Sequence, residues 1–188
     1  LTEIKVKDRN GVIVKRVKLA HSYFQSTINS STPQSKRLRL DRVYEVGNDQ
    51  SELPGHTFTY NNAYAMPPRN SYAHDFLGYN NGSYASWNTN PVPKYYFKNY
   101  KITPFYNSSA IALTGNYSLE ANANYTKTYA LSKITFPTGG TNEYTYELNE
   151  FYFDGNRQGG GLRIKSQKLL DNTGNAQILE YTYAQGRI

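Results

Sequence analysis

The sequence predicts a mainly β fold, an antiparallel twisted sheet of long hairpins with one short helix. Tyrosine is the outlier among the 188 residues, with 19 copies against one Trp and one Met. Tyrosine suits a half-buried pleated surface, because its ring packs while its hydroxyl stays in water. Runs with alternating apolar and polar residues, separated by short segments rich in Gly, Asn and Asp, indicate strands joined by turns.

The first half of the chain begins with a predicted hairpin over residues 4–24. Two β-branched runs flank Asp8-Arg9-Asn10-Gly11, and an Asn-Gly pair tolerates the positive φ angles of a tight primed turn. The elements expected next are a Ser/Thr-rich loop over 24–35, a strand over 36–46, a turn over 48–55 and a strand over 56–62.

An irregular, aromatic-rich insertion is expected over residues 65–116, where prolines interrupt the chain. A stretch of this length packs through its own side chains or carries function. A helix is expected over about 119–131, because Ser118 can act as its N-cap and Glu120 suits the positive end of the helix dipole. Strands over 131–137 and 141–153 and a last hairpin of 161–171 with 176–188 complete a single β-rich module spanning 1–188.

Short internal echoes suggest a sheet grown by repetition. The tetrapeptide EYTY occurs at 143–146 and at 180–183, and TFTY at 57–60 is a looser copy. The turn sequences DRNG and DNTGN resemble each other as well. A recurring unit of turn, strand and Tyr is typical of β-structures built from repeats, although the spacing between these copies is not constant.

Composition and charge exclude several classes of function. The chain has no cysteine, which rules out disulfides, thiolate metal sites and a cysteine nucleophile. Mean hydropathy is −0.73, and no apolar run approaches the length of a membrane-spanning helix. The net charge of +7 is concentrated before residue 45, but Lys5 and Lys7 alternate with apolar residues and share the solvated face of a strand, so no nucleic-acid partner is expected.

The stretch YAHDFLGYNNG, residues 72–82, invites a catalytic interpretation because His74 and Asp75 are adjacent. Neighbours on an extended chain point to opposite sides, so they do not form a catalytic pair. His21, His56 and His74 are the only histidines, and none has metal-ligand spacing. We therefore expect no metal, no cofactor and no catalytic residue here, with Asp75 accepting backbone N–H bonds to shape a loop.

Other candidate sites have simpler structural interpretations. No G-x-S-x-G nucleophile motif occurs, and Glu143, Glu147 and Glu150 are expected on a solvated sheet face. The PTGG stretch at 137–140 lacks the end of a phosphate-binding loop and predicts a tight turn. The GGG stretch at 159–161 predicts a flexible connection.

Surface aromatics next to Asn and Asp suit carbohydrate recognition as well. Trp87, Tyr84 and Tyr95 are the residues expected to stack on sugar rings in that case.

Three stretches in order resemble a known family. MPPRNSYAHDFLGYNNG resembles the P-x-R-x-S-x-x-x-D-x-W-G-Y-x-N-G segment of large Bacteroidetes surface or secreted proteins related to Rhs/YD-repeat proteins. ALSKITFPTGGTNEYTYELNEF and GGGLRIKSQKLLDNTGNAQILEYTY are similar to the segments that follow it there. Leu77 replaces the usual Trp of that family. The matching positions are Pro68, Arg69, Ser71, Asp75, Gly78, Tyr79, Asn81, Gly82, Pro137, Thr138, Gly139, Gly140, Tyr146 and Glu147.

The resemblance implies a non-catalytic structural or interaction module of a large exported protein, with YD-shell-like hairpins that contribute to a β-shell or a cell-surface assembly. Its partners would be neighbouring segments of the same polypeptide, and its location would be extracellular or on the surface of a Gram-negative bacterium. The first residue, Leu1, fits a piece of a longer or processed protein. A carbohydrate- or surface-binding β-module is the alternative, and a glycan-acting hydrolase is the third hypothesis.

Overall fold

The computed structural model describes residues 1–26, 32–83, 118–152 and 156–184, together with the short strands at 95–97, 111–113 and 186–187. The predicted fold class is confirmed, because strands dominate and helix is confined to two short segments, η1 (Pro33–Ser35) and α1 (Ala123–Thr126). The strands are β1 (Glu3–Lys7), β2 (Ile13–Gln25), β3 (Lys36–Glu45), β4 (His56–Tyr60), β5 (Tyr95–Phe97), β6 (Ile111–Leu113), β7 (Leu131–Thr135), β8 (Thr141–Tyr152), β9 (Asn156–Leu170), β10 (Ala176–Glu180) and β11 (Gly186–Arg187).

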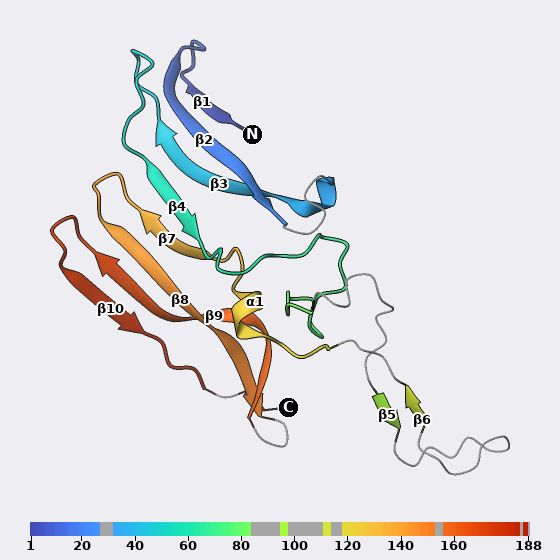
Figure 1. Ribbon diagram of the computed structural model, residues 1–188. Helices are drawn as coiled ribbons and strands as arrows, with labels where there is room; N and C mark the ends of the chain where they lie inside the picture. The colour runs from blue at the N-terminus through green and yellow to red at the C-terminus, as the bar shows by residue number, and fades with distance from the viewer. Residues whose placement is uncertain are drawn as a thin grey trace.

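One large open sheet forms the body of the described chain (Figure 1). Its order is β1-β2-β3-β4-β7-β8-β9-β10, with every neighbour antiparallel, and β11 pairs parallel to β8 beside this path. The strands β5 and β6 form a separate antiparallel pair. The edges of the large sheet are therefore β1 and β10.

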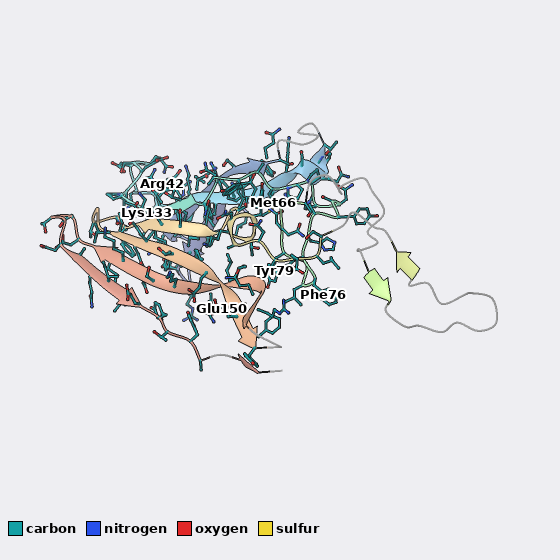
Figure 2. All side chains as sticks on the ribbon, turned by 60° about the horizontal axis from the view of Figure 1, so that its bottom comes forward. Arg42, Met66, Phe76, Tyr79, Lys133 and Glu150 are labelled. Carbon is teal, nitrogen blue, oxygen red and sulfur yellow. The ribbon has the colours of Figure 1, made fainter. Side chains whose placement is uncertain are left out.

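Among the described residues, no second layer covers β10, the last strand in the order of the large sheet. Side chains project from both faces of β9 and β10 (Figure 2), and every residue of β10 is exposed. Buried apolar side chains are few in the described parts of the chain: Val46, Ala73 and Leu148, together with the prolines Pro67 and Pro68. Seven buried residues are polar, so the described interior relies on hydrogen bonds as much as on apolar contact.

A single five-residue turn recurs five times in the described ranges, at 8–12, 47–51, 75–79, 136–140 and 171–175. In each copy the first residue donates its N–H to the carbonyl of the fifth, and the fourth donates to the carbonyl of the first. The fourth residue has positive φ and is Gly in four copies and Gln50 in the other. This geometry is a tight turn followed by a left-handed residue, so the primed turn expected at Asn10-Gly11 is wrong, because only Gly11 has positive φ there.

The echoed tetrapeptides occupy equivalent places in three hairpins, β3–β4, β7–β8 and β9–β10. In each hairpin the last tyrosine of the tetrapeptide donates its hydroxyl hydrogen to a backbone carbonyl of the first strand. The distances are 2.8 Å from Tyr60 to Leu40, 2.7 Å from Tyr146 to Leu131 and 2.6 Å from Tyr183 to Ile164. Burial raises the pKa of Tyr60 and of Tyr146, so both stay protonated donors.

A β-bulge directly follows each of these acceptor carbonyls. The register shifts leave Asp41 in β3, Ser132 in β7 and Lys165 in β9 as the extra residues. Because a bulge interrupts the regular ladder, the hydroxyl supplies a hydrogen bond where the ladder is weakest. The copies are unevenly spaced in the sequence because the connections between these strands differ in length.

The helix expected over 119–131 is wrong in extent, since α1 covers only Ala123–Thr126. Its N-cap is Asn122, whose side chain accepts the N–H of Asn124, rather than Ser118. The chain leaves the helix at Tyr129, which has a φ of 64°, and β7 starts at Leu131. The apolar residues of this stretch lack a helical period, so nothing drives a longer helix to pack.

Two further boundaries differ from expectation. The insertion at 65–116 is not irregular throughout, because β5 and β6 lie within it. The last strand ends at Glu180 instead of continuing to 188, and Gly186–Arg187 pairs with β8 as β11. Pairing between the two strands of the last hairpin is therefore limited to the five residues of β10.

The Gln50 turn predicts a simple stabilisation. Gln50→Gly should raise the free energy of unfolding by about 1 kcal/mol, because a side chain at positive φ is strained. Chemical denaturation measures the change.

The matched control is Gly174→Ala, which should lower stability by about 1 kcal/mol. No atom lies within 4 Å of a Cβ built on Gly174, so this variant tests backbone conformation alone. Equal stability of Gln50→Gly and the wild type would contradict the shared turn geometry.

The tyrosine hydrogen bonds predict a second effect. Tyr146→Phe should lower the free energy of unfolding by about 1 kcal/mol, because the carbonyl beside the bulge loses its donor. Tyr23→Phe serves as control, since Tyr23 is 60% exposed. Denaturation curves in which both variants lose the same stability would argue against a special role for the Tyr146 hydroxyl.

Candidate functional site

The stretch 72–82 folds into a small hairpin closed by a bridge between His74 and Asn80. Its turn is the recurring five-residue turn, with Asp75 N donating to Tyr79 O at 2.7 Å and Gly78 N to Asp75 O at 3.0 Å. Gly78 has a φ of 91°, which requires glycine or a strained side chain. The residues that first suggest a catalytic pair thus form a hairpin turn.

Asp75 anchors this turn with its carboxylate. Its Oδ1 accepts the backbone N–H groups of Leu77 and Tyr79, both at 2.9 Å, and its side chain is only 2% exposed. His74 Nδ1 lies 3.0 Å from the backbone oxygen of Asp75, so the two neighbours meet through the main chain. Asp75 therefore acts as a fixed acceptor for amides.

The same carboxylate arrangement occurs in two hairpin turns of the sheet. Asp8 Oδ1 accepts the amides two and four residues later at 2.9 and 2.8 Å, and Asp171 Oδ1 does so at 2.8 and 2.9 Å. The common sequence signal is D-x-x-G, which also occurs at Asp75–Gly78. Sequence reasoning predicted hairpin turns at the first and last of these sites and expected Asp75 to accept backbone amides in a loop, and the shared spacing shows that all three are the same turn.

Two asparagines attach the 72–82 hairpin to the segment around α1. Their amide groups donate to backbone carbonyls, and one backbone carbonyl of the hairpin accepts a threonine hydroxyl. The bonds are Asn81 Nδ2 to Ser118 O at 2.6 Å and to His74 O at 3.2 Å, Asn80 Nδ2 to Tyr125 O at 3.2 Å, and Thr126 Oγ1 to Asn80 O at 3.2 Å.

Gly82 completes this contact because it leaves room for an aromatic ring. A Cβ built on Gly82 would lie 2.4 Å from the ring of Tyr125, and its φ is 75°. Both the space and the backbone conformation thus require glycine at this position.

The G-G-G stretch receives the other side of the hairpin. The expectation of a flexible connection at 159–161 is wrong, because these residues lie inside β9. A Cβ on Gly160 would lie 2.4 Å from Asp75 Oδ2, and one on Gly161 would lie 3.1 Å from Tyr79 Oη. Asn149 of β8 fixes the same place by donating to Gly160 O at 3.2 Å. The glycines thus form a close-packed seat for Asp75 and Tyr79.

The PTGG stretch forms the five-residue turn between β7 and β8, with Pro137 and Thr138 at its tip. Gly139 has a φ of 90°, and a Cβ on Gly140 would lie 2.8 Å from the carbonyl of Leu170. The stretch therefore shapes a turn against the end of β9.

The strand carboxylates are engaged in ion pairs or face lysines. Arg163 Nε donates to Glu147 Oε1 at 2.7 Å, and the Arg163 guanidinium also lies 4.5 Å from the ring centre of Tyr183. Glu143 lies in register with Lys133 on one side and Lys168 on the other. Glu147 thus pairs with Arg163 of the neighbouring strand β9, and Arg163 in turn contacts the last tyrosine repeat.

The remaining predicted residues have separate places. Arg69 joins the 61–83 segment to η1, since its N–H donates to Gln34 O at 3.0 Å and its Nη2 to Pro33 O at 3.2 Å. Trp87 and Tyr84 lie outside the described residues, and only the backbone of Tyr95 is described, in β5. Stacking of these rings on a sugar stays a prediction.

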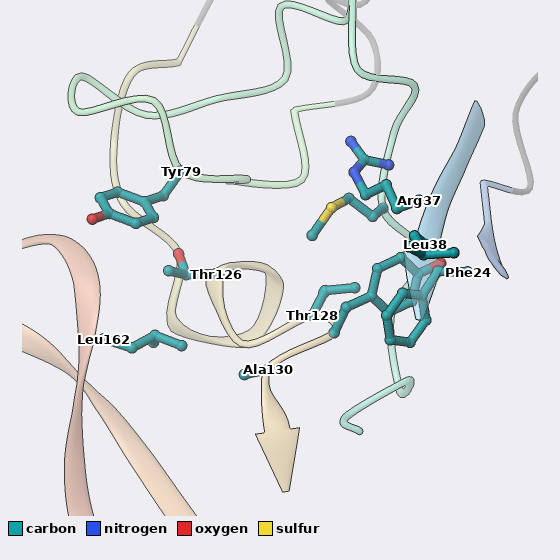
Figure 3. Close-up of a pocket in the computed structure, with 10 residues that line it drawn as sticks. Phe24, Arg37, Leu38, Tyr79, Thr126, Thr128, Ala130 and Leu162 are labelled. Carbon is teal, nitrogen blue, oxygen red and sulfur yellow. The ribbon is translucent and has the colours of Figure 1, made fainter. Parts of the chain in front are cut away.

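A cleft of about 540 Å³ opens between the sheet and the 61–83 segment. Its walls come from β2, β3, β9 and the turn after α1, and Figure 3 shows Arg37, Tyr79 and Thr128 around it. Sequence reasoning missed this cleft because its residues are distant in the chain and share no motif.

The described residues contain no group of three or more His, Asp or Glu side chains that could hold a metal ion. In the same parts of the chain, no helix has the length and apolar character needed to cross a membrane. Comparison of the chain with protein-family models, curated proteins and solved structures gives no match in any of the three.

The close contact of Gly160 with Asp75 predicts that a methyl group added at Gly160 will disturb the Asp75 turn. Gly160→Ala should lower the free energy of unfolding by about 2 kcal/mol, because its Cβ would overlap the Asp75 carboxylate. Amide hydrogen exchange at Leu77 and Tyr79 should accelerate at the same time.

Gly159→Ala is the control, since its Cβ would lie 3.3 Å from the nearest atom, Phe151 Cε1. It should leave the exchange of both amides near the wild-type rate. Unchanged exchange in Gly160→Ala would refute the seat.

The Asp171 turn predicts a dependence of stability on pH. Hydrogen bonds from Asn175 and Thr173 lower the pKa of Asp171 from its ordinary value of 3.8. At low pH the unfolded chain then binds more protons than the folded one, so this stabilisation is complete above about pH 5 and is lost as pH falls toward the lowered folded pKa.

Asp171→Asn retains an Oδ1 acceptor but does not titrate. As pH falls below about 4, the free energy of unfolding of the wild type should therefore decrease more steeply than that of Asp171→Asn. Urea denaturation at a series of pH values measures this difference. Parallel curves for the two proteins would contradict the role of the ionised carboxylate.

Proposed function

We propose that this chain is a non-catalytic structural module of a large exported protein related to the Rhs/YD-repeat proteins. Its hairpins contribute strands to a β-shell or cell-surface assembly outside a Gram-negative cell. The observation that supports this proposal is the repeated hairpin unit, in which a tyrosine hydroxyl bonds the carbonyl before a bulge. Repetition of one unit along an open sheet is the physical basis of a structure that grows by addition.

The register of the sheet supports the addition of a further hairpin. Tyr60 lies opposite Leu131, and Tyr146 lies opposite Ile164. Tyr60 and Tyr146 thus each bond a carbonyl within their own hairpin. Each also lies opposite, on the following strand of the sheet, the residue that precedes the bulge of that strand. Tyr183 follows β10 at the open edge, where an additional hairpin would continue this pattern.

The β10 edge offers backbone groups for that addition. Tyr181 donates its N–H to Lys165 O of β9, and antiparallel pairing alternates along the strand, so the amides of Ile178 and Glu180 point away from β9. Exposed strand edges pair with other chains unless they are covered. The partner we propose is a strand from a neighbouring segment of the same polypeptide.

The chemistry of the described residues favours a structural role over catalysis. Asp75 is buried with Oδ1 bonded to two amides, and Glu147 pairs with Arg163. Several basic side chains in the first 45 residues form ion pairs with acidic side chains. These pairs are Arg16 with Glu3, Lys15 with Glu45 and Arg42 with Glu52. This pairing supports the proposal that nucleic acid is not a partner.

Hydrogen exchange tests this function directly. In the isolated chain the amides of Ile178 and Glu180 should exchange fast, because they face the open edge. In the full-length protein they should be protected at least about tenfold more, as covered strand amides are. The amides of Gln177 and Leu179 should be protected in both, as they point toward β9. Fast exchange of Ile178 and Glu180 in both proteins would refute the proposal.

A further inference from the structure

Arg37 is a half-buried cation that has no counter-ion among the described residues. Its Nη1 is buried and makes no hydrogen bond to any described residue. No ion pair in the described ranges includes Arg37. Burial lowers the pKa of Arg37, while Tyr129 acts in the opposite direction and Arg69 in the same direction as burial. Buried charges in proteins are normally paired, so a bound anion would suit the Arg37 guanidinium.

The chain itself offers little to supply that anion. Segments 27–31, 84–117 and 185–188 contain no Asp or Glu, and Asp154 is the one acidic side chain outside the described residues. The acidic side chains that form ion pairs in the described residues pair with basic residues other than Arg37, as Asp41 does with Arg39. The counter-ion of Arg37 is therefore best sought in a bound molecule.

The cleft around Arg37 combines hydroxyl groups with flat apolar surfaces. Thr128 Oγ1 is buried and has no hydrogen-bond partner among the described residues. Tyr79 is 45% exposed and Leu38 is 64% exposed, and both line the cleft. Phe24 and Tyr129 stack at 4.0 Å on another wall. A ring that carries hydroxyls, an apolar face and a negative charge matches these groups.

We propose that this cleft binds the carboxylate of an acidic sugar, a hexuronate residue. Arg37 pairs with the carboxylate, Thr128 bonds a ring hydroxyl or the same carboxylate, and Tyr79 packs against the sugar face. The cleft volume of about 540 Å³ is that of a small-molecule site. Guanidinium–carboxylate pairing supplies both affinity and orientation.

An acidic protein segment fits the cleft less well. Added strands bind along exposed sheet edges, which are β1 and β10 here, whereas residues of β2, β3 and β9 line the cleft. A single Asp or Glu side chain would also leave most of the cleft volume unfilled. The site is independent of the edge proposed above for sheet growth.

Isothermal titration with digalacturonate tests the proposal, with its methyl ester as the uncharged probe of the same rings. Digalacturonate should bind saturably, and the ester should bind about tenfold more weakly or not at all. Arg37→Gln should weaken digalacturonate binding about ten- to hundredfold, since a charged hydrogen-bonded pair is lost. Lys36→Gln is the matched control, because it removes an equal charge from the neighbouring, exposed position of β3.

Chemical-shift mapping on the wild type keeps the test independent of variant folding. Digalacturonate should shift the amides of Thr126 to Ala130 and leave those of β10 unchanged. Absence of saturable binding, equal binding of the ester, or equal weakening by Lys36→Gln would overturn the proposal. Phenylacetate or tetraglutamate binding through Arg37 without digalacturonate binding would also overturn it, by assigning the cleft to an aromatic acid or an acidic peptide.

Discussion

A hydrogen bond between a tyrosine hydroxyl and the carbonyl before a β-bulge joins the two strands of each of three hairpins in the sheet. A sheet with few buried apolar side chains gains little from a core. Its strands must therefore be held by interactions within the layer. Tyr60, Tyr146 and Tyr183 each cross one strand boundary and bond a carbonyl at a bulge. Tyrosine suits this position because it combines a long, flat apolar body with a terminal hydroxyl donor.

The second constraint is close packing between the 72–82 hairpin and β9. Asp75 and Tyr79 rest on Gly160 and Gly161, which have no side chains to hold them away. Asp75 Oδ1 is occupied by two amides, while Oδ2 is buried and unpaired among the described residues. The turn therefore has a cost in desolvation, which its two charge-assisted bonds and the bonds of the neighbouring asparagines offset. The hairpin in turn forms one wall of the cleft through Tyr79.

These two features connect the proposed structural role with the proposed ligand. The sheet supplies a rigid floor from β2, β3 and β9, and the anchored 61–83 segment closes one side of the cleft above it. A module that adds strands at β10 keeps this cleft free, since the edge and the cleft involve different strands. Sheet growth and carboxylate binding are therefore compatible in one molecule, and each is tested without the other.

The sequence by itself determined the fold class, the hairpin turns and the repeated tetrapeptides. Period-two alternation and D-x-x-G turns are local signals, because they depend on residues within one strand or one turn. Local signals misjudged the length of α1 (Ala123–Thr126) and the role of the glycines at 159–161. Both depend on residues that are distant in the sequence, because packing against such neighbours limits the helix and requires glycine in β9. The Tyr183 bond to Ile164, the Gly160 seat for Asp75 and the unpaired Arg37 were decided only by tertiary structure. Each of them joins residues that strand pairing or loop docking brings together, and no spacing in the sequence specifies which carbonyl, glycine or cation a side chain meets.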